Sequence, residues 1–335
     1  MKAWQLTAQT GPAALQIAEL PEPAPGPGQV LVRTRAVSLN YRDQMVADGR
    51  YGRVTLPLVP LSDGAGEIAA VGAGVTRWQT GDRVAGTFFQ GWLTGPFRRE
   101  YQGLALGGAL PGMLAEYVIL GEHGVVAVPA HLDFAQAATL PCAGLTAWHA
   151  LVAVGNITAA ETVLLLGTGG VSLFALQFAK MHGARVIIIS SSEEKLARAK
   201  ALGADGLINY RAMPDWEREV FRLTGKAGVA QVVEVGGSGT LAKSLRSLAP
   251  GGQVHLVGGV SGFTGEVPLL DIIGKMAVVR GIYVGSREMF EAMNRALVGH
   301  RTNPVVDRVF DFGDAPAAYQ YQLSGSHFGK VVITV

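Results

Sequence analysis

The sequence predicts a chain in two parts: an all-β module built from both ends of the chain, and between its parts an α/β domain with a doubly wound, mostly parallel sheet. Short segments of strand character, separated by glycine and proline turns, fill residues 1 to 128. From Pro129 onward, strand and helix patterns alternate, which is typical of a parallel sheet covered by helices. We therefore expect one domain over 1–128, completed by 285–335, and a second over 129–284.

Composition excludes several classes of protein. A chain of 335 residues with 49% hydrophobic and 16% charged residues can fill two cores and is not disordered. A net charge of +2 without a long basic run argues against nucleic acid as a partner. The single cysteine, Cys142, excludes a disulfide framework and any multi-cysteine metal site. Because no apolar run reaches about 18 residues, we expect a cytoplasmic protein with no membrane partner.

Seven short strands are expected in the first module. The proline-rich segment 21–28 reads as an exposed connector, and 88–112 reads as a loop. Such spacing favours a compact, barrel-like arrangement. The expected strands are Lys2–Thr7, Leu15–Leu20, Gln29–Leu39, Gly66–Val71, Asp82–Gly86, Met113–Leu120 and Val125–Val128.

The stretch Thr162–Ser190 predicts a dinucleotide site. An apolar run, a glycine cluster, apolar residues at helical spacing and a second β-branched run form a βαβ unit of the Rossmann type. Gly167 and Gly169 match the G-x-G-x-x-G template, and Ser172 replaces its third glycine. A pyrophosphate would meet free N–H groups at the helix N-terminus. The alternative is an ordinary turn without a ligand. The expected cofactor contacts here are Gly167, Thr168, Gly169, Gly170 and Val171.

The alternation continues to residue 284. Six strand candidates between 163 and 284 complete a doubly wound sheet, so the C-terminal segments should return to the first module. The remaining expected strands of the sheet are Leu207–Tyr210, Gln231–Val235, Val254–Val257 and Ala277–Val284. Helices are expected over Asp133–Thr139, Leu145–Val154 and Gly239–Leu248, and from Pro214. The returning tail comprises a helix over Arg287–Val298 and strands over Val305–Phe310 and Lys330–Val335.

The end of the second strand of the βαβ unit indicates the cofactor. Dinucleotide sites for NAD usually place an acid there, but this strand ends in Ser190 and Ser191. Hydroxyls with Lys195 nearby suit a 2′-phosphate, which predicts NADP(H); an ordinary solvated lysine is the alternative. Gly258 and Gly259, after the fifth strand, should lie near the nicotinamide end and permit close backbone approach.

Two segments, Gly64–Gly86 and Leu140–Leu151, are similar to markers of the medium-chain dehydrogenase/reductase superfamily. The resemblance covers the whole chain and implies a GroES-like β-barrel catalytic domain beside the Rossmann domain. Zinc-dependent members bind catalytic zinc through Cys, His and Cys, and these positions are Asn40, Ser62 and Cys142 here. The segment that carries four structural-zinc cysteines in such members has none here. The resemblance therefore implies that both zinc sites are absent.

The chain most resembles the zinc-free quinone oxidoreductase branch of that superfamily. This resemblance implies that Asn40 and Tyr51 face the substrate and that Lys195 and Tyr210 contact the NADPH phosphate. Lys330, in the tail, is expected to reach the cofactor. Pairing of Ala277–Val284 across a two-fold axis is implied as well, which makes a homodimer the expected assembly.

Without a metal, no strong Lewis acid polarises a carbonyl, so the sequence favours hydride transfer to an already electrophilic acceptor. A hydrogen-bond donor would stabilise the developing enolate; the candidates are Asn40, Tyr51 and Tyr41. Asn40 as a cap and Tyr51 as a packing residue are the alternatives. Four further side chains have structural interpretations: Asp43 as a helix N-terminal acid, Asp63 as an orienting carboxylate, and Cys142 and His149 as core residues.

The sequence therefore predicts an NADPH-dependent, zinc-independent oxidoreductase that acts on a small quinone or an α,β-unsaturated carbonyl. One alternative is an NADP-dependent alcohol or aldehyde dehydrogenase of the same superfamily, which would need a metal. A second is a catalytically silent protein that binds NADPH in a structural or sensing role.

Overall fold

The computed structural model describes residues 1–335, and the contacts divide them into two compact units. The first unit comprises Met1–Leu145 and Val284–Val335, and the second comprises Thr146–Tyr283. The sequence-based domain limits, after residues 128 and 284, were drawn from patterning alone and remain a prediction.

The first unit contains a seven-stranded sheet in the order β14-β15-β3-β4-β5-β7, with β6 also paired to β3. All pairs are antiparallel except β14 with β15. A separate antiparallel pair joins β1 and β2. The strands are β1 (Lys2–Leu6), β2 (Leu15–Glu19), β3 (Gln29–Ser38), β4 (Asp63–Val71), β5 (Arg83–Gly86), β6 (Tyr117–Gly121), β7 (Val125–Ala127), β14 (Val306–Asp311) and β15 (Lys330–Thr334). The helices of eight or more residues are α9 (Arg287–His300) and α10 (Ala315–Leu323), and the shorter ones include α1 (Tyr41–Ala47) and α2 (Phe134–Ala137).

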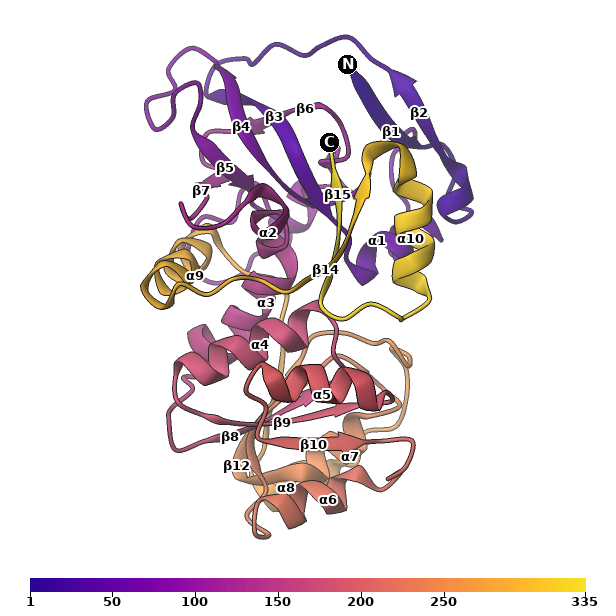
Figure 1. Cartoon of the computed structure of the whole chain (residues 1–335), viewed down its shortest axis with the longest axis vertical. Coiled ribbons are helices and arrows are strands. Elements are labelled where there is room, and N and C mark those ends of the chain that lie inside the picture. The colour runs from indigo at the N-terminus through magenta and orange to yellow at the C-terminus, as the bar shows by residue number, and fades with distance from the viewer. The chain divides into compact units, whose positions relative to one another are not determined.

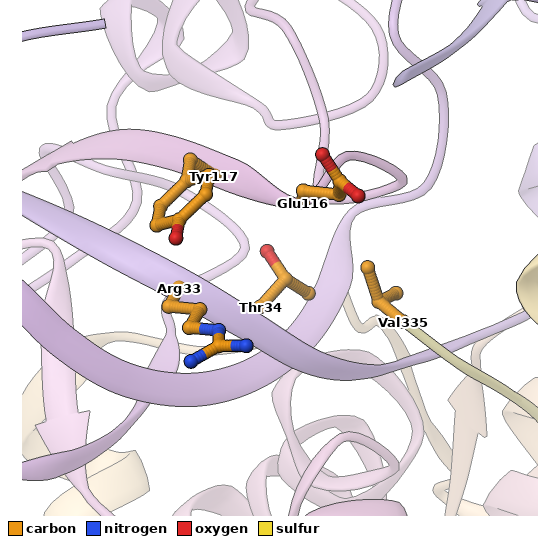
Figure 2. Close-up of a pocket in the computed structure, with 5 residues that line it drawn as sticks. All are labelled: Arg33, Thr34, Glu116, Tyr117 and Val335. Carbon is orange, nitrogen blue, oxygen red and sulfur yellow. The ribbon is translucent and has the colours of Figure 1, made fainter. Parts of the chain in front are cut away.

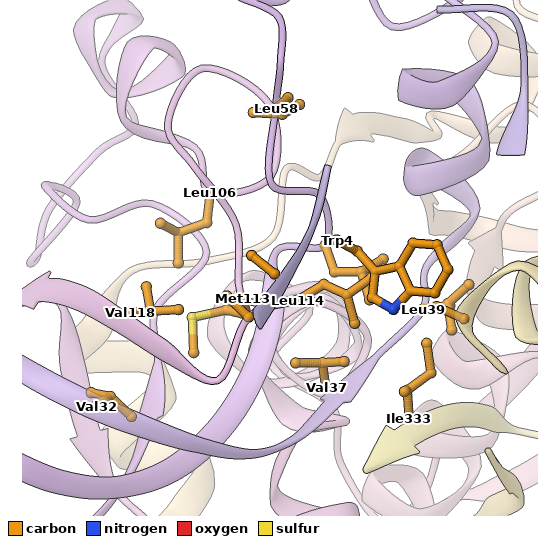
Figure 3. Close-up of a cluster of buried hydrophobic side chains, with 14 of the residues drawn as sticks. Trp4, Val32, Val37, Leu39, Leu58, Leu106, Met113, Leu114, Val118 and Ile333 are labelled. Atoms are coloured by element: carbon orange, nitrogen blue, oxygen red, sulfur yellow. The ribbon is translucent and has the colours of Figure 1, made fainter. Parts of the chain in front are cut away.

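The C-terminal tail belongs to the first unit. Strand β15 pairs with β3, placing Val332 opposite Ser38, and in Figure 1 the yellow C-terminal strand lies beside the indigo β3. The core of this unit draws on both ends of the chain: Trp4, Val37 and Ile333 are buried together (Figure 3). The indole of Trp4 also donates to the carbonyl of Phe312. The tail is thus an integral part of the first core.

The first unit differs in detail from what the sequence predicts. The strand predicted from Met113 begins only at Tyr117, because the Met113 and Leu114 amides donate to the carbonyls of Leu61 and Pro60. Helix α10 was not predicted, and α1 was expected only through the interpretation of Asp43 as a helix N-terminal acid. Helix α1 has only seven residues, too few for an apolar period to show in the sequence.

The second unit contains a six-stranded, all-parallel sheet in the order β10-β9-β8-β11-β12-β13, as the doubly wound class requires. Helices α4 and α5 cover one face and α6, α7 and α8 the other (Figure 1). The strands are β8 (Thr162–Leu166), β9 (Arg185–Ser190), β10 (Gly206–Asn209), β11 (Val229–Glu234), β12 (Leu248–Leu256) and β13 (Val278–Gly281). The helices are α4 (Gly170–Met181), α5 (Glu193–Ala201), α6 (Trp216–Leu223), α7 (Leu241–Ser247) and α8 (Leu269–Lys275). The predicted fold class is confirmed.

The helical start predicted at Pro214 was wrong by two residues. Helix α6 begins at Trp216, and the Pro214 carbonyl instead accepts a hydrogen bond from the Lys243 ammonium. The predicted helix over 145–154 consists of α3 (Leu145–Trp148) followed by a wider, π-type segment, His149–Val154. Neither difference alters the sheet, because the strands are fixed by continuous apolar runs that helices bury on both faces.

A buried polar chain crosses the second unit between β12, β11 and the turn before β8. His255 is fully buried, and its Nε2 lies 3.0 Å from Oε1 of Gln231. The Gln231 amide donates in turn to the Glu161 carboxylate at 2.7 Å. Burial lowers the pKa of His255 to about 4, and the positive charge of Arg280 acts in the same direction. The imidazole is therefore neutral at physiological pH.

Replacement of His255 should weaken the acid sensitivity of the fold. The folded-state pKa lies below the unfolded value near 6.5, so the unfolded chain binds the proton more readily and stability falls as the pH drops from about 6.5 to about 4. The full effect of this group is about 3 kcal/mol. In His255→Gln, which keeps a donor for Gln231 but does not titrate, urea denaturation should show a smaller loss of stability over that range. Equal losses of stability in both proteins would show that protonation of His255 is not the cause of the acid sensitivity.

Candidate functional site

In the first unit, Asn40 links the end of β3 to α1. Its backbone N–H donates to Oδ2 of Asp43 at 2.7 Å, and the residue occupies the N-cap position with an extended backbone. Asp43 is thus the helix N-terminal acid that the sequence predicted. The side-chain Oδ1 of Asn40 accepts a hydrogen bond from Nζ of Lys330 at 2.6 Å. The backbone and the amide of Asn40 are therefore each held by a charged side chain.

Lys330 arrives at this place from β15, nearly three hundred residues later. Only 3% of its surface is exposed, and its ammonium also donates to the carbonyl of Leu39. Asp63, at the start of β4, is fully buried beside them. Its carboxylate accepts from the Ser62 hydroxyl at 2.8 Å and from the Cys142 amide at 3.1 Å. The fold brings together side chains that the sequence could only name singly.

Burial is the largest electrostatic influence on this cluster, and opposite charges offset part of it. Burial raises the pKa of Asp43 to about 6, while the neighbouring Arg42 acts to lower it. Burial likewise raises the pKa of Asp63, against the attraction of Lys330. Burial lowers the pKa of Lys330, and the negative charge of Asp63 acts to raise it. Two cations and two carboxyl groups thus share one dry environment.

The two tyrosine candidates, Tyr51 and Tyr41, both contact arginine side chains. The guanidinium of Arg42 lies 4.8 Å from the ring centre of Tyr51 and 4.6 Å from that of Phe88. Its Nη1 donates to the carbonyl of Leu106 at 2.7 Å. Tyr51 therefore serves as one face of a cation–π sandwich. Tyr41 is 38% exposed, and its hydroxyl accepts from Arg50 at 3.4 Å.

The residues at the zinc-ligand positions do not fit a zinc ion. Oδ1 of Asn40 is taken by an ammonium group, and the Ser62 hydroxyl donates to Asp63. Burial raises the pKa of the Cys142 thiol, and the negative charge of Asp63 raises it further, so the thiol stays protonated. Zinc needs a deprotonated or neutral donor set free of a competing cation. No group of three or more His, Cys, Asp or Glu side chains elsewhere in the chain is arranged for a metal either.

In the second unit, the glycine turn between β8 and α4 has the shape that a pyrophosphate needs. Gly167 has a φ of +73°, and a Cβ there would point into open space. Gly169 is the N-cap of the twelve-residue α4, which begins with Gly170 and Val171, and Thr168 between the glycines is buried. Ser172 is buried, and its hydroxyl donates to the carbonyl of Leu166 at 2.7 Å. The serine that replaces the third glycine therefore joins the first turn of α4 to the end of β8 by a hydrogen bond.

The residues predicted for a 2′-phosphate meet at the carboxyl ends of β9 and β10. Ser190 is buried, Ser191 is half-buried, and Ser192 caps α5 by accepting from the Lys195 amide. The Tyr210 amide donates to the carbonyl of Ser190 at 3.1 Å, so the two strand ends are adjacent. Glu193 accepts from the Asn209 amide group at 2.6 Å, which keeps its carboxylate at the helix start. Serine hydroxyls therefore stand at the end of β9, where a dinucleotide site for NAD usually has an acid.

Sequence reasoning missed Glu234, at the end of β11. Its carboxylate accepts from the amides of Gly236 and Gly237 at 2.7 and 3.0 Å, and from the Thr240 hydroxyl at 2.7 Å. The Gly258 amide donates to the backbone carbonyl of Glu234 at 3.3 Å, and Gly259 lies so close to Gly237 that a side chain on the latter would collide. Glu234 thus shapes the loops after β11 and β12. An acid at a strand end directly before a glycine loop is the signal that would have found it.

A separate surface cavity of about 190 Å³ lies on the first unit (Figure 2). It is lined by Arg33, Thr34, Glu116, Tyr117 and Val335. None of these residues belongs to the cluster around Asn40 or to the predicted cofactor contacts. The helices offer no membrane span either, since none is both long and apolar enough to cross a bilayer.

Comparison with known proteins identifies the class to which this fold and site belong. The family model of the alcohol dehydrogenase GroES-like domain matches residues 26–130, and that of the zinc-binding dehydrogenases matches residues 170–299. A zinc-type alcohol dehydrogenase-like protein of Schizosaccharomyces pombe is 43% identical over 316 residues, which cover 92% of this chain and 91% of that protein. The chain belongs to the medium-chain dehydrogenase/reductase superfamily, and it is an oxidoreductase of that class.

Other relatives carry two kinds of name. A quinone oxidoreductase of Pseudomonas aeruginosa is 35% identical over 304 residues, covering 89% of this chain and 87% of the relative. A solved Sinorhizobium meliloti protein described as an alcohol dehydrogenase has a TM-score of 0.94 at 44% identity, covering 100% of this chain and 98% of the other. A mycobacterial protein solved with NADPH has a TM-score of 0.86 at 28% identity and covers 100% and 99%. The structure with NADPH supports a nicotinamide cofactor as the ligand of this fold.

Proposed function

We propose that this protein is an NADPH-dependent, zinc-independent oxidoreductase that reduces quinones or α,β-unsaturated carbonyl compounds. The observation that carries the proposal is the cluster at the metal position. There, Lys330 donates to Asn40, and the buried charges of Lys330 and Asp63 offset each other, in place of a zinc donor set. An acceptor that is already electrophilic needs orientation and a hydrogen bond rather than a Lewis acid.

The roles of the chain's own residues follow from their geometry. Bound NADPH supplies the hydride. The Asn40 amide is the donor to the acceptor oxygen, on which negative charge develops. Arg42, held between Tyr51 and Phe88, adds a fixed positive charge to the same environment. The proton that completes the product comes from solvent, since Cys142 and the nearby Tyr319 both have pKa values raised by burial.

The test is an activity screen combined with a metal analysis. NADPH oxidation is monitored with a panel of quinones and enones, and with alcohols in the presence of NADP⁺, on protein whose metal content is measured. We expect turnover with quinones or enones, no loss on treatment with a chelator, and far less than one zinc per chain. One zinc per chain with alcohol oxidation would establish the alcohol dehydrogenase alternative. Tight NADPH binding without turnover on any acceptor would establish the sensing alternative.

Lys195→Glu should reverse the preference between the two nicotinamide cofactors. An acid beside Ser190 and Ser191 would repel a 2′-phosphate and could accept a hydrogen bond from a ribose hydroxyl. We expect kcat/KM for NADPH to fall about 100-fold, equivalent to about 2.7 kcal/mol, while the value for NADH rises or holds. Steady-state kinetics with both cofactors measures this. Lys200→Glu, an exposed change five residues further along α5, is the matched control, and equal effects of the two variants would contradict a specific phosphate contact.

We further propose a cytoplasmic homodimer joined through the edge of the second unit's sheet. Strand β13 lies at that edge with Val278 and Val279 exposed. A run of exposed apolar side chains precedes it: Val260, Phe263, Val267, Leu269, Leu270, Ile273 and Met276. A monomer rarely leaves so many large apolar side chains of one segment exposed to water. An unpaired edge of β-branched residues suits pairing with a second copy.

Substitution in this patch should therefore separate the subunits. In Leu270→Glu/Ile273→Glu the two buried charges would oppose association, and sedimentation should report a monomer where the wild-type protein reports a dimer. The same pair of charges placed at exposed apolar positions of the first unit, as Val298→Glu/Val309→Glu, is the control. A wild-type protein that sediments as a monomer would contradict the proposal.

A further inference from the structure

The side-chain amide of Asn40 could point either way in its pocket, and the structure shows which way it is held. Nζ of Lys330 lies 2.6 Å from one of its two terminal atoms. An ammonium group has three donors and no acceptor, so the atom that it contacts must be the amide oxygen. The other terminal atom, Nδ2, is buried and makes no hydrogen bond within the chain. The two N–H bonds of Asn40 are thus turned away from Lys330.

The lysine itself is well fixed. It is 3% exposed and donates to the Leu39 carbonyl as well as to Asn40, so its ammonium bridges two consecutive residues at the end of β3. The residue before it, Gly329, has a φ of +92°, and a Cβ there would lie 2.5 Å from the carbonyl oxygen of Val305. The close approach of β15 to β14 therefore fixes the position of the Lys330 backbone. Asp63 lies near enough to favour the charged ammonium.

The remaining contacts of Asn40 leave its amide with one preferred direction. Its backbone N–H is bound by Asp43, which prevents rotation of the peptide. Its amino group lies toward Asp63, where it favours the ionised carboxylate, although the geometry falls short of a hydrogen bond. At least one N–H bond of Nδ2 therefore has no acceptor in the chain, and a donor in this state is what an oxyanion requires.

We propose that Lys330 is a positioning residue: by occupying Oδ1 of Asn40, it fixes the amide so that Nδ2 faces the acceptor oxygen during hydride transfer. This inference rests on the proposed function and deepens it. It gives Lys330 a role through Asn40 in place of the direct cofactor contact expected from the sequence. Hydride addition forms the carbon–hydrogen bond, and the electron pair that it displaces onto oxygen is held by the Asn40 donor until a solvent proton arrives.

Kinetics of a double-mutant cycle provide the first test. Lys330→Met keeps the length of the side chain but cannot donate, and we expect kcat to fall about 10- to 100-fold with little change in the Kd of NADPH. In an Asn40→Ala background, the same change should cost little more, since there is no amide left to orient. Lys330→Gln, whose amide can still donate to Oδ1, should recover part of the loss. If the losses of kcat from the two substitutions multiply, Lys330 does not act through Asn40 and the proposal is overturned. If Lys330→Met weakens NADPH binding in both backgrounds, a direct contact with the cofactor is favoured instead.

A spectroscopic test works even if no acceptor is turned over. The chain has five asparagines, at 40, 156, 209, 294 and 303, so ¹⁵N-asparagine labelling gives few side-chain signals, and Asn40→Asp identifies the one of interest. In Lys330→Met this signal should shift and broaden as the amide begins to flip. Lys275→Met is the matched control, because Lys275 donates to the carbonyls of Arg246 and Leu248 in the second unit. An unchanged Asn40 signal would overturn the inference, whereas inactivity of the wild-type protein would affect only the proposed function.

Discussion

Asn40→Ala should reduce kcat for quinone or enone reduction about 100- to 1,000-fold, the loss typical of removing one donor from an oxyanion site. The reason is that the buried Nδ2 of Asn40 has no acceptor in the chain and is free to donate to the acceptor oxygen. NADPH affinity should be nearly unchanged, because the predicted phosphate contacts are elsewhere in the chain. Stopped-flow kinetics of NADPH oxidation, with Kd from cofactor fluorescence, measures both quantities.

Two further variants make this result specific. Asn40→Asp leaves an oxygen for Lys330 but has no N–H, so it should lose as much activity as Asn40→Ala. Asn303→Ala, the same substitution at an exposed position of the first unit, should retain full activity. If Asn40→Asp is as active as the wild-type protein, Asn40 is a helix cap with no role in transfer, which is the structural alternative that its sequence position also allowed.

Asp63→Asn should destabilise the protein by about 3–5 kcal/mol, the usual cost of removing one member of a buried pair of charges. Lys330 and Asp63 compensate each other in a dry environment, and each is penalised by burial. The carboxylate also accepts from two donors, Ser62 Oγ and the Cys142 amide, on different oxygens. Asparagine has one acceptor oxygen, so one of these donors loses its partner. Urea denaturation at neutral pH measures the loss.

The double variant Asp63→Asn/Lys330→Met is the decisive comparison. Once both charges are gone, no unpaired ion stays buried, so the double variant should be no less stable than either single variant. Strictly additive losses would show that Asp63 and Lys330 act independently, and the charge-balanced cluster would then be wrong.

The sequence by itself was sufficient for the fold class. Continuous β-branched runs such as Val186–Ile189 are buried on both faces, and the glycine turn at Gly167 needs a positive φ that few other residues adopt. These are local properties, readable within a few residues. The same holds for the N-terminal position of Asp43 in α1 and for the serines at the end of β9.

The short helices and the contacts between residues far apart in the chain could not be predicted from local sequence patterns. Helix α1 is defined by its cap at Asn40 and by packing rather than by an apolar period. The role of Ser172 became clear only with the Leu166 carbonyl in place. Glu234 shapes its loops through three donors that follow it within six residues, but the spacing alone did not reveal that pattern.

What the sequence determined is therefore the class of fold, the glycine turn for a dinucleotide and the loss of zinc-ligand residue types at Asn40 and Ser62. What only the tertiary structure decided is the surroundings of Asn40. Lys330 and Asn40 are separated by 290 residues, and their contact exists because β15 pairs with β3. A side chain's hydrogen-bond partner, its burial and hence its charge state depend on such distant pairings, which no local pattern in the chain records.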